Sequence, residues 1–336
     1  MKNMIESHRT DWFHAARWGV SSHYLAESAS FTSPTDLTAE EWNRQVDAFD
    51  VEGLANQIAA TGAGFFMLTI GQNSGYYCSP NATYDAIVGR VPSHCSRRDL
   101  MMELAEALAM RGVSLIAYLP SNAPESDALA KEKFSYEWGY SEPWPGGWRD
   151  ELRTGQRQAE FQIKWESVIR EWSLRWGDKV RGWWFDGCYF ADAMYRHPDA
   201  PNFQSFAAAA RAGNPNSILA FSPGIFDPDA IGPLAVADAE DYTGGETNNP
   251  QNFECRGRWV EGENGHREQW HMWSFLGKGW CDGAPRFSDE TAIEITRNAV
   301  KNEGVVMWDV PIERSGLIPP EYFEQLQAIG RALRAV

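Results

Sequence analysis

The feature of this 336-residue chain that most restricts its fold is a repeated pairing of an amphipathic helical segment with a short apolar one. Asp50 can cap a helix with apolar residues at helical spacing, and the run over 64–70 then has the composition of a buried strand. The pair recurs as a helix that starts at the capping-box-like Ser96 and Asp99, followed by a strand over 113–118. This alternation predicts a parallel sheet covered by helices.

The second half of the chain continues the pattern. The expected helices cover 156–176, 289–302 and the residues after Pro319 and Pro320, and the expected strands cover 180–186, 217–222 and 304–309. Between 223 and 288 the pattern is weak, which predicts loops. A doubly wound sheet would also alternate, but the chain length and the lack of a Gly-rich phosphate-binding turn after a strand favour a (β/α)₈ TIM-like barrel. We therefore expect one α/β domain over residues 1–336, with its chemistry where the strands end.

Charge and composition narrow the expected partners. The net charge of −16 repels phosphate backbones, so nucleic acid is not an expected partner. No apolar stretch is long enough to span a membrane, and the N-terminus lacks the apolar core of a signal peptide. A cytoplasmic protein is expected, or a periplasmic or secreted one if a signal was trimmed. Five cysteines without a CxxC pair support neither disulfides nor zinc, which fits a reducing compartment. The sequence leaves open whether the protein forms a homo-oligomer.

Two acidic side chains stand out as candidates for catalysis. Asp186 ends a very hydrophobic strand, where a barrel would present it at its mouth beside aromatic walls. Its other role would be to cap the next helix. Glycoside hydrolysis typically uses two carboxyl groups, one ionised and one protonated. The acidic stretch over 238–246 is the best source of the second, because Gly244 and Gly245 would let it bring Glu246 over a cleft. The alternative is that the stretch over 238–246 is a solvent-exposed loop without a catalytic role.

Aromatic and polar residues also collect at other predicted strand ends, and sixteen tryptophans provide flat faces suited to sugar rings or to core packing. As a set, these residues predict a hydroxyl-binding pocket. Its candidate members are His23, Gln72, Asn73, Tyr76, Tyr77, Tyr118, His266, Trp270, His271 and Trp273. His266 and His271 are not at a helical metal-binding spacing and no HExxH motif occurs, so neither a metal nor another cofactor is expected.

In order and spacing, a series of segments resembles the α-L-fucosidases of glycoside hydrolase family 29. They are Trp12–Tyr24, Gly62–Thr69, Arg111–Ser121, Trp184–Gly187, Asp241–Glu246, Gln269–Trp273, Glu303–Pro311 and Gly316–Pro319. The segment over 184–187 reads Trp-Phe-Asp-Gly, which is similar to the motif that bears the nucleophile in that family. The resemblance covers nearly the whole chain and implies a barrel fold.

The resemblance also implies roles for single residues. Asp186 matches the nucleophile of the family, His23 matches a sugar-binding histidine, and Trp184 lines the pocket. Glu246 matches the acid/base of many members, although the position of that residue varies within the family. The alternatives nearby are Glu240, Asp241, Glu261 and Glu263.

The chain departs from the family around the sugar pocket. A His-His-Asp-Gly-Phe run reads Gln72–Tyr76 here, so amides stand where two imidazoles grip fucose hydroxyls. The family's Asn-Asp-Arg-Trp segment reads Phe221–Gly224 and lacks its arginine, and no C-terminal β-sandwich is expected. We expect a retaining exo-glycosidase that cleaves a terminal fucose or related sugar through a covalent glycosyl-Asp intermediate. The alternatives are a glycosidase of different sugar specificity and a catalytically silent carbohydrate-binding barrel.

Overall fold

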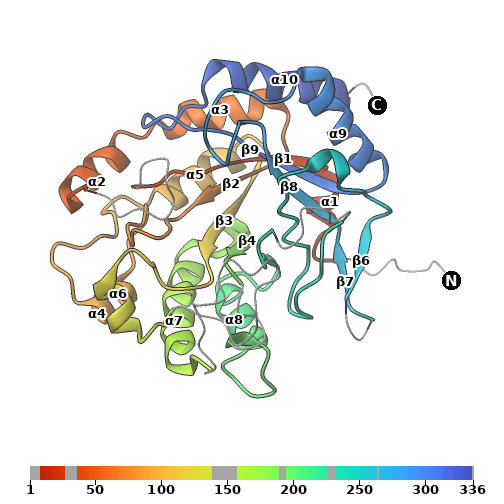
Figure 1. Ribbon diagram of the computed structural model, residues 1–336. Coiled ribbons are helices and arrows are strands. Elements are labelled where there is room, and N and C mark those ends of the chain that lie inside the picture. The colour runs from red at the N-terminus through yellow and green to blue at the C-terminus, as the bar shows by residue number, and fades with distance from the viewer. Residues whose placement is uncertain are drawn as a thin grey trace.

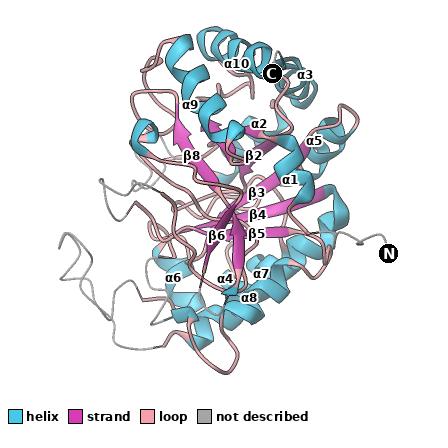
Figure 2. Ribbon diagram, turned by 90° about the vertical axis from the view of Figure 1, so that its right-hand side faces the viewer, coloured by secondary structure: helices cyan, strands magenta, loops and turns pink. Residues whose placement is uncertain are grey.

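Seven parallel strands form a curved sheet at the centre of the molecule, with helices around it (Figures 1 and 2). This computed structural model describes residues 8–26, 36–137, 157–188, 194–225, 232–262 and 265–334. The strand order is β5-β4-β3-β2-β1-β9-β8. The strands are β1 (Trp18–Ser22), β2 (Phe65–Thr69), β3 (Ser114–Pro120), β4 (Val180–Asp186), β5 (Ile218–Phe221), β8 (His271–Phe275) and β9 (Val305–Asp309). The predicted barrel-type α/β fold is therefore confirmed.

Ten α-helices occur in the described residues, and the larger ones pack side by side around the outside of the sheet. They are α1 (Asp11–Ala16), α2 (Ala39–Asp47), α3 (Val51–Thr61), α4 (Ala82–Val88), α5 (Leu100–Ala109), α6 (Ala128–Phe134), α7 (Ala159–Trp176), α8 (Phe203–Ala210), α9 (Asp289–Lys301) and α10 (Pro320–Arg334). α10 lies between α9 and α3, and α3 packs on α5, as Figure 1 shows. In the ranges given above, no helix combines the length and the apolar character needed to cross a membrane.

Helix ends follow the capping residues. The Asp50 carboxylate accepts a hydrogen bond from the first turn of α3, and Gly62 ends that helix at a φ of 81°. Asp99 caps α5 in the same way. The predicted helix start at Ser96 is wrong, because the Ser96 N–H donates to the Tyr77 carbonyl (2.8 Å) and the chain is still extended there.

The segment over 241–247 joins the two edge strands and closes the barrel. On one side the Trp273 N–H of β8 donates to the Gly245 carbonyl (2.8 Å). On the other side the Asp241 N–H donates to the Leu219 carbonyl of β5 (2.9 Å). The segment therefore stands where an eighth strand would stand in a closed barrel.

Between this segment and β5, two carboxylates accept backbone hydrogen bonds that strand carbonyls would accept in a regular sheet. Asp241 Oδ2 accepts from the Leu219 N–H (2.9 Å), and Glu240 Oε1 accepts from the Phe221 N–H (2.6 Å). Asp241 is also paired with Arg211 (2.5 Å). Both acids are almost fully buried, and both serve to hold the closing segment in place.

Close backbone packing explains the two glycines of the closing segment. A Cβ atom on Gly245, whose φ is 67°, would lie 2.1 Å from the His271 carbonyl oxygen. A Cβ atom on Gly244 would lie 3.0 Å from the Cα atom of Ser222. The loop-rich stretch over 223–288 also supplies β8 and the barrel closure, which its weak pattern does not predict. The hydrophobic pattern does not reveal the closure because carboxylates make part of its strand pairing.

Alternate strand residues fill the barrel with aromatic rings. Tyr118 stacks on Trp184, with centroids 5.2 Å apart, and Trp273 meets Trp184 edge-on at 4.3 Å. α1 closes the end where the strands begin, and its Phe13 packs on Phe65 at 4.8 Å. Many of the tryptophans that could have formed a sugar platform are thus fully buried in the core.

A hairpin of β6 (Trp259–Glu261) and β7 (Arg267–Gln269) packs beside the closing segment and buries Glu268. Within the described residues, its two carboxyl oxygens make no hydrogen bond of ordinary geometry. Burial, with the nearby charges of Glu240 and Asp241, raises the pKa of Glu268 to about 11. Glu268 therefore holds its proton in the folded protein at neutral pH.

Glu268→Gln is expected to make the stability of the fold less dependent on pH. The folded state keeps the Glu268 proton and the unfolded state loses it above its ordinary pKa, so the free energy of unfolding falls as pH rises toward 11. This slope is at most about 1.4 kcal/mol per pH unit. Urea unfolding at several values between about pH 5 and pH 9, where the folded state holds the Glu268 proton and the unfolded state does not, measures this slope. Parallel pH profiles for the wild-type chain and the variant would contradict this expectation.

Candidate active site

Polar side chains gather at the carboxyl ends of the strands. Side chains two positions apart share one face of a strand, so a residue two positions beyond a core residue points into the barrel mouth. Asp186, for example, follows the interior Trp184 on β4. The residues placed in this way are His23, Asp186, Ser222, Glu246 and Asp309.

Asp186 is held by three hydrogen-bond donors, from Tyr118, Gly187 and Gln72. Its Oδ2 accepts from the Tyr118 hydroxyl (2.5 Å), and its Oδ1 accepts from the Gly187 N–H (2.7 Å). The Gln72 amide in turn donates to the Tyr118 oxygen (2.6 Å), which leaves the Tyr118 proton for Asp186. Burial raises the pKa of Asp186, and these donors act against that rise.

Glu246 lies in the closing segment and accepts one hydrogen bond, from the Ser222 hydroxyl (2.9 Å). Burial and the charge of Asp186 together raise the pKa of Glu246 to about 8. The Tyr118, Gly187 and Gln72 donors stabilise the ionised form of Asp186, whereas Glu246 has one hydroxyl donor. When the two groups share one proton at neutral pH, that proton therefore resides on Glu246.

His23 is fixed by a buried carboxylate. Its Nδ1 lies 3.0 Å from Asp309 Oδ1, which fixes the orientation of the ring. Asp309 is fully buried, and it also accepts from the Ser21 hydroxyl (3.0 Å) and the Cys281 N–H (2.7 Å). The His23 ring stacks on Trp273, with centroids 5.7 Å apart. His23 is thus a rigidly held polar group close to Asp186.

Two residues predicted for the pocket are engaged elsewhere. Tyr76 donates its hydroxyl to the Leu37 carbonyl (2.6 Å) and stacks on His94 at 3.8 Å. Trp270 donates its indole N–H to the Glu254 carbonyl (3.2 Å). Sugar binding by Tyr76 and Trp270 stays a prediction.

His271 lies at the far end of the barrel from the two carboxyl groups, because it is the first residue of β8. It packs on Phe13 at 5.5 Å, and its Nδ1 lies 3.0 Å from the Thr243 carbonyl. Burial lowers the pKa of His271 to about 4, so the ring is neutral. Asn73 is half-buried, and its carbonyl accepts from the Ser126 N–H (2.9 Å). Its part in substrate binding stays a prediction.

Of the remaining aromatic candidates, one reaches the site and two lie elsewhere. Trp273 reaches the site from β8, as its stacking described above shows. Tyr77 packs in the core against Trp172, with centroids 5.2 Å apart. His266 lies at the closing segment, with its Nε2 2.8 Å from the Glu240 carbonyl.

The other acidic candidates fit an acid/base role less well than Glu246. Glu240 and Asp241 are occupied by the barrel closure. Glu261 is exposed on β6, and Glu263 lies outside the described residues. Within the described part of the chain, no group of three or more His, Cys, Asp or Glu side chains could hold a metal ion.

Two residues of the site were not singled out from the sequence. Ser222 and Asp309 each come at or just after the end of an apolar strand, as Asp186 does. That shared position was the available signal for Asp309, whereas a serine after a strand is too common to indicate a role.

A barrel with a protonated and an ionisable carboxyl group at the carboxyl ends of its strands has the design of a glycoside hydrolase. A family model described as alpha-L-fucosidase matches residues 1–335. The chain therefore belongs to the α-L-fucosidase family. No curated protein sequence matches it.

Solved structures show the same fold. The chain is similar to the endo-fucoidan hydrolase MfFcnA4 from glycoside hydrolase family 107, with 16% identity and a TM-score of 0.73 over 97% of this chain and 53% of that one. The endo-fucoidan hydrolase MfFcnA9 of the same family is 16% identical, with a TM-score of 0.71 over 97% of this chain and 64% of that one. The alpha-L-fucosidase isoenzyme 1 from Paenibacillus thiaminolyticus is 16% identical, with a TM-score of 0.63 over 97% of this chain and 75% of that one. The chain thus spans less than two thirds of the length of the first two.

Tyr118→Phe is expected to shift the acidic side of the pH–activity profile to higher pH. The variant removes a hydrogen bond to the ionised form of Asp186, so the pKa of Asp186 rises further. A hydrogen bond to a charged group contributes about 1.5–3 kcal/mol, which corresponds to a shift of about 1–2 pH units. The measurement is kcat/KM against pH.

The matched control for this substitution is Tyr84→Phe. Tyr84 is also buried, and its hydroxyl faces the Gly75 carbonyl rather than the site. We expect its profile to equal that of the wild-type protein. An acidic limb that stays in place in Tyr118→Phe would show that Tyr118 does not hold the charge of Asp186.

Proposed function

We propose that this chain is a retaining exo-glycosidase that removes a terminal α-L-fucose or a related sugar. The family match and the α-L-fucosidase and fucoidan hydrolases among its structural neighbours support a fucose-active enzyme. In this proposal Asp186 attacks the anomeric carbon and forms a glycosyl ester while Glu246 protonates the leaving oxygen. Glu246 then takes a proton from water, which releases the sugar.

The observation that carries the proposal is the unequal environment of the two acids. Asp186 accepts from Tyr118 and Gly187, which favours its ionised form, as a nucleophile requires. Glu246, with one hydroxyl donor and a pKa of about 8, is protonated at neutral pH, as a general acid requires.

The sugar hydroxyls would meet a different set of groups from those in the family pattern. The Gln72 amide donates to the Tyr118 oxygen (2.6 Å), and its side-chain hydrogen bond also acts on Asp186 directly, so in this proposal it supports the nucleophile. His23, held by Asp309, is then the best-placed imidazole for a hydroxyl. One imidazole in place of several would accept a wider range of sugars, which favours testing fucose first and its relatives next.

Substitution of the two acids should separate their roles on nitrophenyl α-L-fucoside and related aryl glycosides. Asp186→Asn is expected to lower kcat by at least about 10³-fold, because no nucleophile remains. Glu246→Gln should lose about 10²–10⁴-fold on substrates with poor leaving groups and regain turnover when azide is added. Proton NMR of the first-formed anomer tests retention.

Glu261→Gln serves as the matched control for Glu246→Gln, since Glu261 is exposed on β6. It should keep wild-type activity. Undiminished activity in Asp186→Asn would end the proposal, and hydrolysis of no aryl glycoside or fucose-containing polymer by the wild-type protein would favour a silent sugar-binding barrel. Cleavage of the polymer alone would replace the exo action with an endo action.

The alkaline side of the pH profile should report Glu246. Activity requires its proton, so kcat/KM is expected to fall as the pH rises through about 8, the pKa of Glu246. In Glu246→Gln, assayed with an activated leaving group, this descent should disappear. The same descent in both proteins would assign it to another group.

A further inference from the structure

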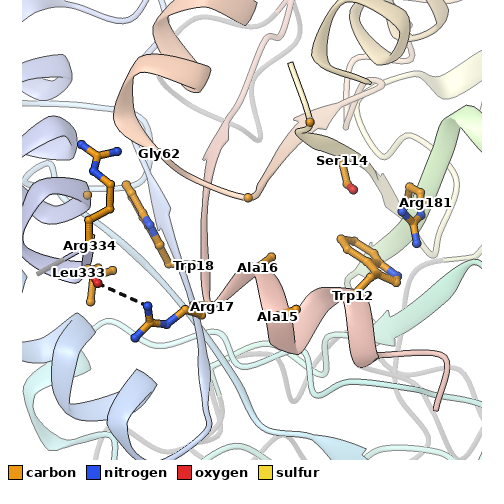
Figure 3. A pocket seen from close by; sticks show the side chains of 13 residues that line it. Trp12, Ala15, Ala16, Arg17, Trp18, Gly62, Ser114, Arg181, Leu333 and Arg334 are labelled. Carbon is orange, nitrogen blue, oxygen red and sulfur yellow. Dashed lines mark hydrogen bonds between the residues drawn. The ribbon is translucent and has the colours of Figure 1, made fainter. Parts of the chain in front are cut away.

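A second hollow lies at the opposite end of the barrel, where the strands begin (Figure 3). Its volume is about 530 Å³, and it is bounded by α1, the starts of β1, β3 and β4, and the end of α10. Thirteen residues line it. Three are arginines, Arg17, Arg181 and Arg334, and none is Asp or Glu.

Among the described residues, the three guanidinium groups form no ion pair with a carboxylate. Arg17 donates to the Leu333 carbonyl (3.3 Å), and the charge of Asp178 acts on Arg181. In a chain with 46 acidic and 30 basic residues, three arginines around one acid-free hollow create a local positive field.

The backbone of Arg17 carries strain that a glycine would relieve. Arg17 has φ 70° and ψ −47°, a conformation that residues with side chains rarely adopt. Strain of this kind is retained mainly where a side chain has a task. Here it links α1 to β1 and places the guanidinium on the wall of the hollow (Figure 3).

The rest of the lining suits a ring-shaped molecule with charges at two ends. Figure 3 shows Arg17 and Arg334 on the side of Trp18, and Arg181 across the hollow beside Trp12. The Arg181 guanidinium lies over the Trp12 ring at 4.6 Å, which orients it.

Glycines keep the space between these walls open. Gly62 has a φ of 81°, and a Cβ atom there would lie 2.5 Å from Arg334 Nη1. A Cβ atom on Gly64 would lie 2.6 Å from the side chain of Ala16.

We propose that this hollow binds a sugar-sized organic anion that carries two phosphate or sulfate ester groups. Guanidinium groups bind the oxygens of such esters through paired hydrogen bonds, and arginines on both walls call for an anion at each end of the ligand. The volume lies in the range of small-molecule sites. The hollow shares no residue with the carboxylate pair, so the site is independent of the proposed hydrolysis.

Calorimetry on the full chain at low salt tests the proposal with four probes. Fructose 1,6-bisphosphate represents phosphate esters and a disulfated disaccharide represents sulfate esters. Glucose 6-phosphate should bind at least about 10-fold more weakly than the better of these, because it meets one wall only, and glucose should not bind. Binding should weaken as sodium chloride is added. The ester that binds more tightly identifies whether the site is built for phosphate or for sulfate esters. If neither ester binds, the proposal is overturned.

Variants then locate the binding. Arg17→Gln combined with Arg334→Gln, and separately Arg181→Gln, should each weaken binding by at least about 10-fold. The matched control is Arg331→Gln, an exposed arginine one turn away on α10 that does not line the hollow, and its affinity should stay within about twofold. Circular dichroism checks that each variant is folded. Equal losses in Arg331→Gln, or no loss in the hollow variants, would show that the anion binds elsewhere.

Discussion

The hydrogen bonds from two backbone N–H groups of β5 to the carboxylates of Glu240 and Asp241 are the interaction on which the rest of the site depends. They let a stretch without regular strand geometry take the eighth place in the barrel. Burying two acids is costly unless their oxygens are satisfied, and here backbone donors and Arg211 satisfy them. Because the stretch is tied at this end, Glu246 enters the mouth facing Asp186.

The division of labour between the two acids arises from their donors rather than from their depth. Burial raises the pKa of each acid, and the charge of Asp186 raises the pKa of Glu246 further. Tyr118, Gly187 and Gln72 donate to Asp186, whereas Ser222 alone donates to Glu246, so the proton that they share resides on Glu246. Tyr118 is also one of the stacked rings of the interior, so the core of the barrel and the charge of Asp186 are linked through this side chain.

Much of this arrangement could be predicted from the sequence, and the rest could not be predicted for physical reasons. The strand that ends in Asp186 and the helices after Asp50 and Asp99 follow local patterns of polarity and capping, and the structure has them at those positions. The closure by 241–247 could not be predicted, because its pairing runs through side chains and glycines. Tyr76, Trp270 and His271 sit near strand ends in the sequence, but the period of the strand alone does not tell which end or which face a side chain occupies.

The replacement of an imidazole by the amide of Gln72 has a consequence for how the enzyme tolerates its surroundings. An amide has the same charge in acid and in alkali, so the orientation it imposes on the Tyr118 hydroxyl does not change as the medium changes. A histidine in that place would gain a proton near neutrality and reverse the direction of its hydrogen bonds. The hydrogen bond from Gln72 to Tyr118, and through it the support of Asp186, therefore keeps one direction over a wide range of pH.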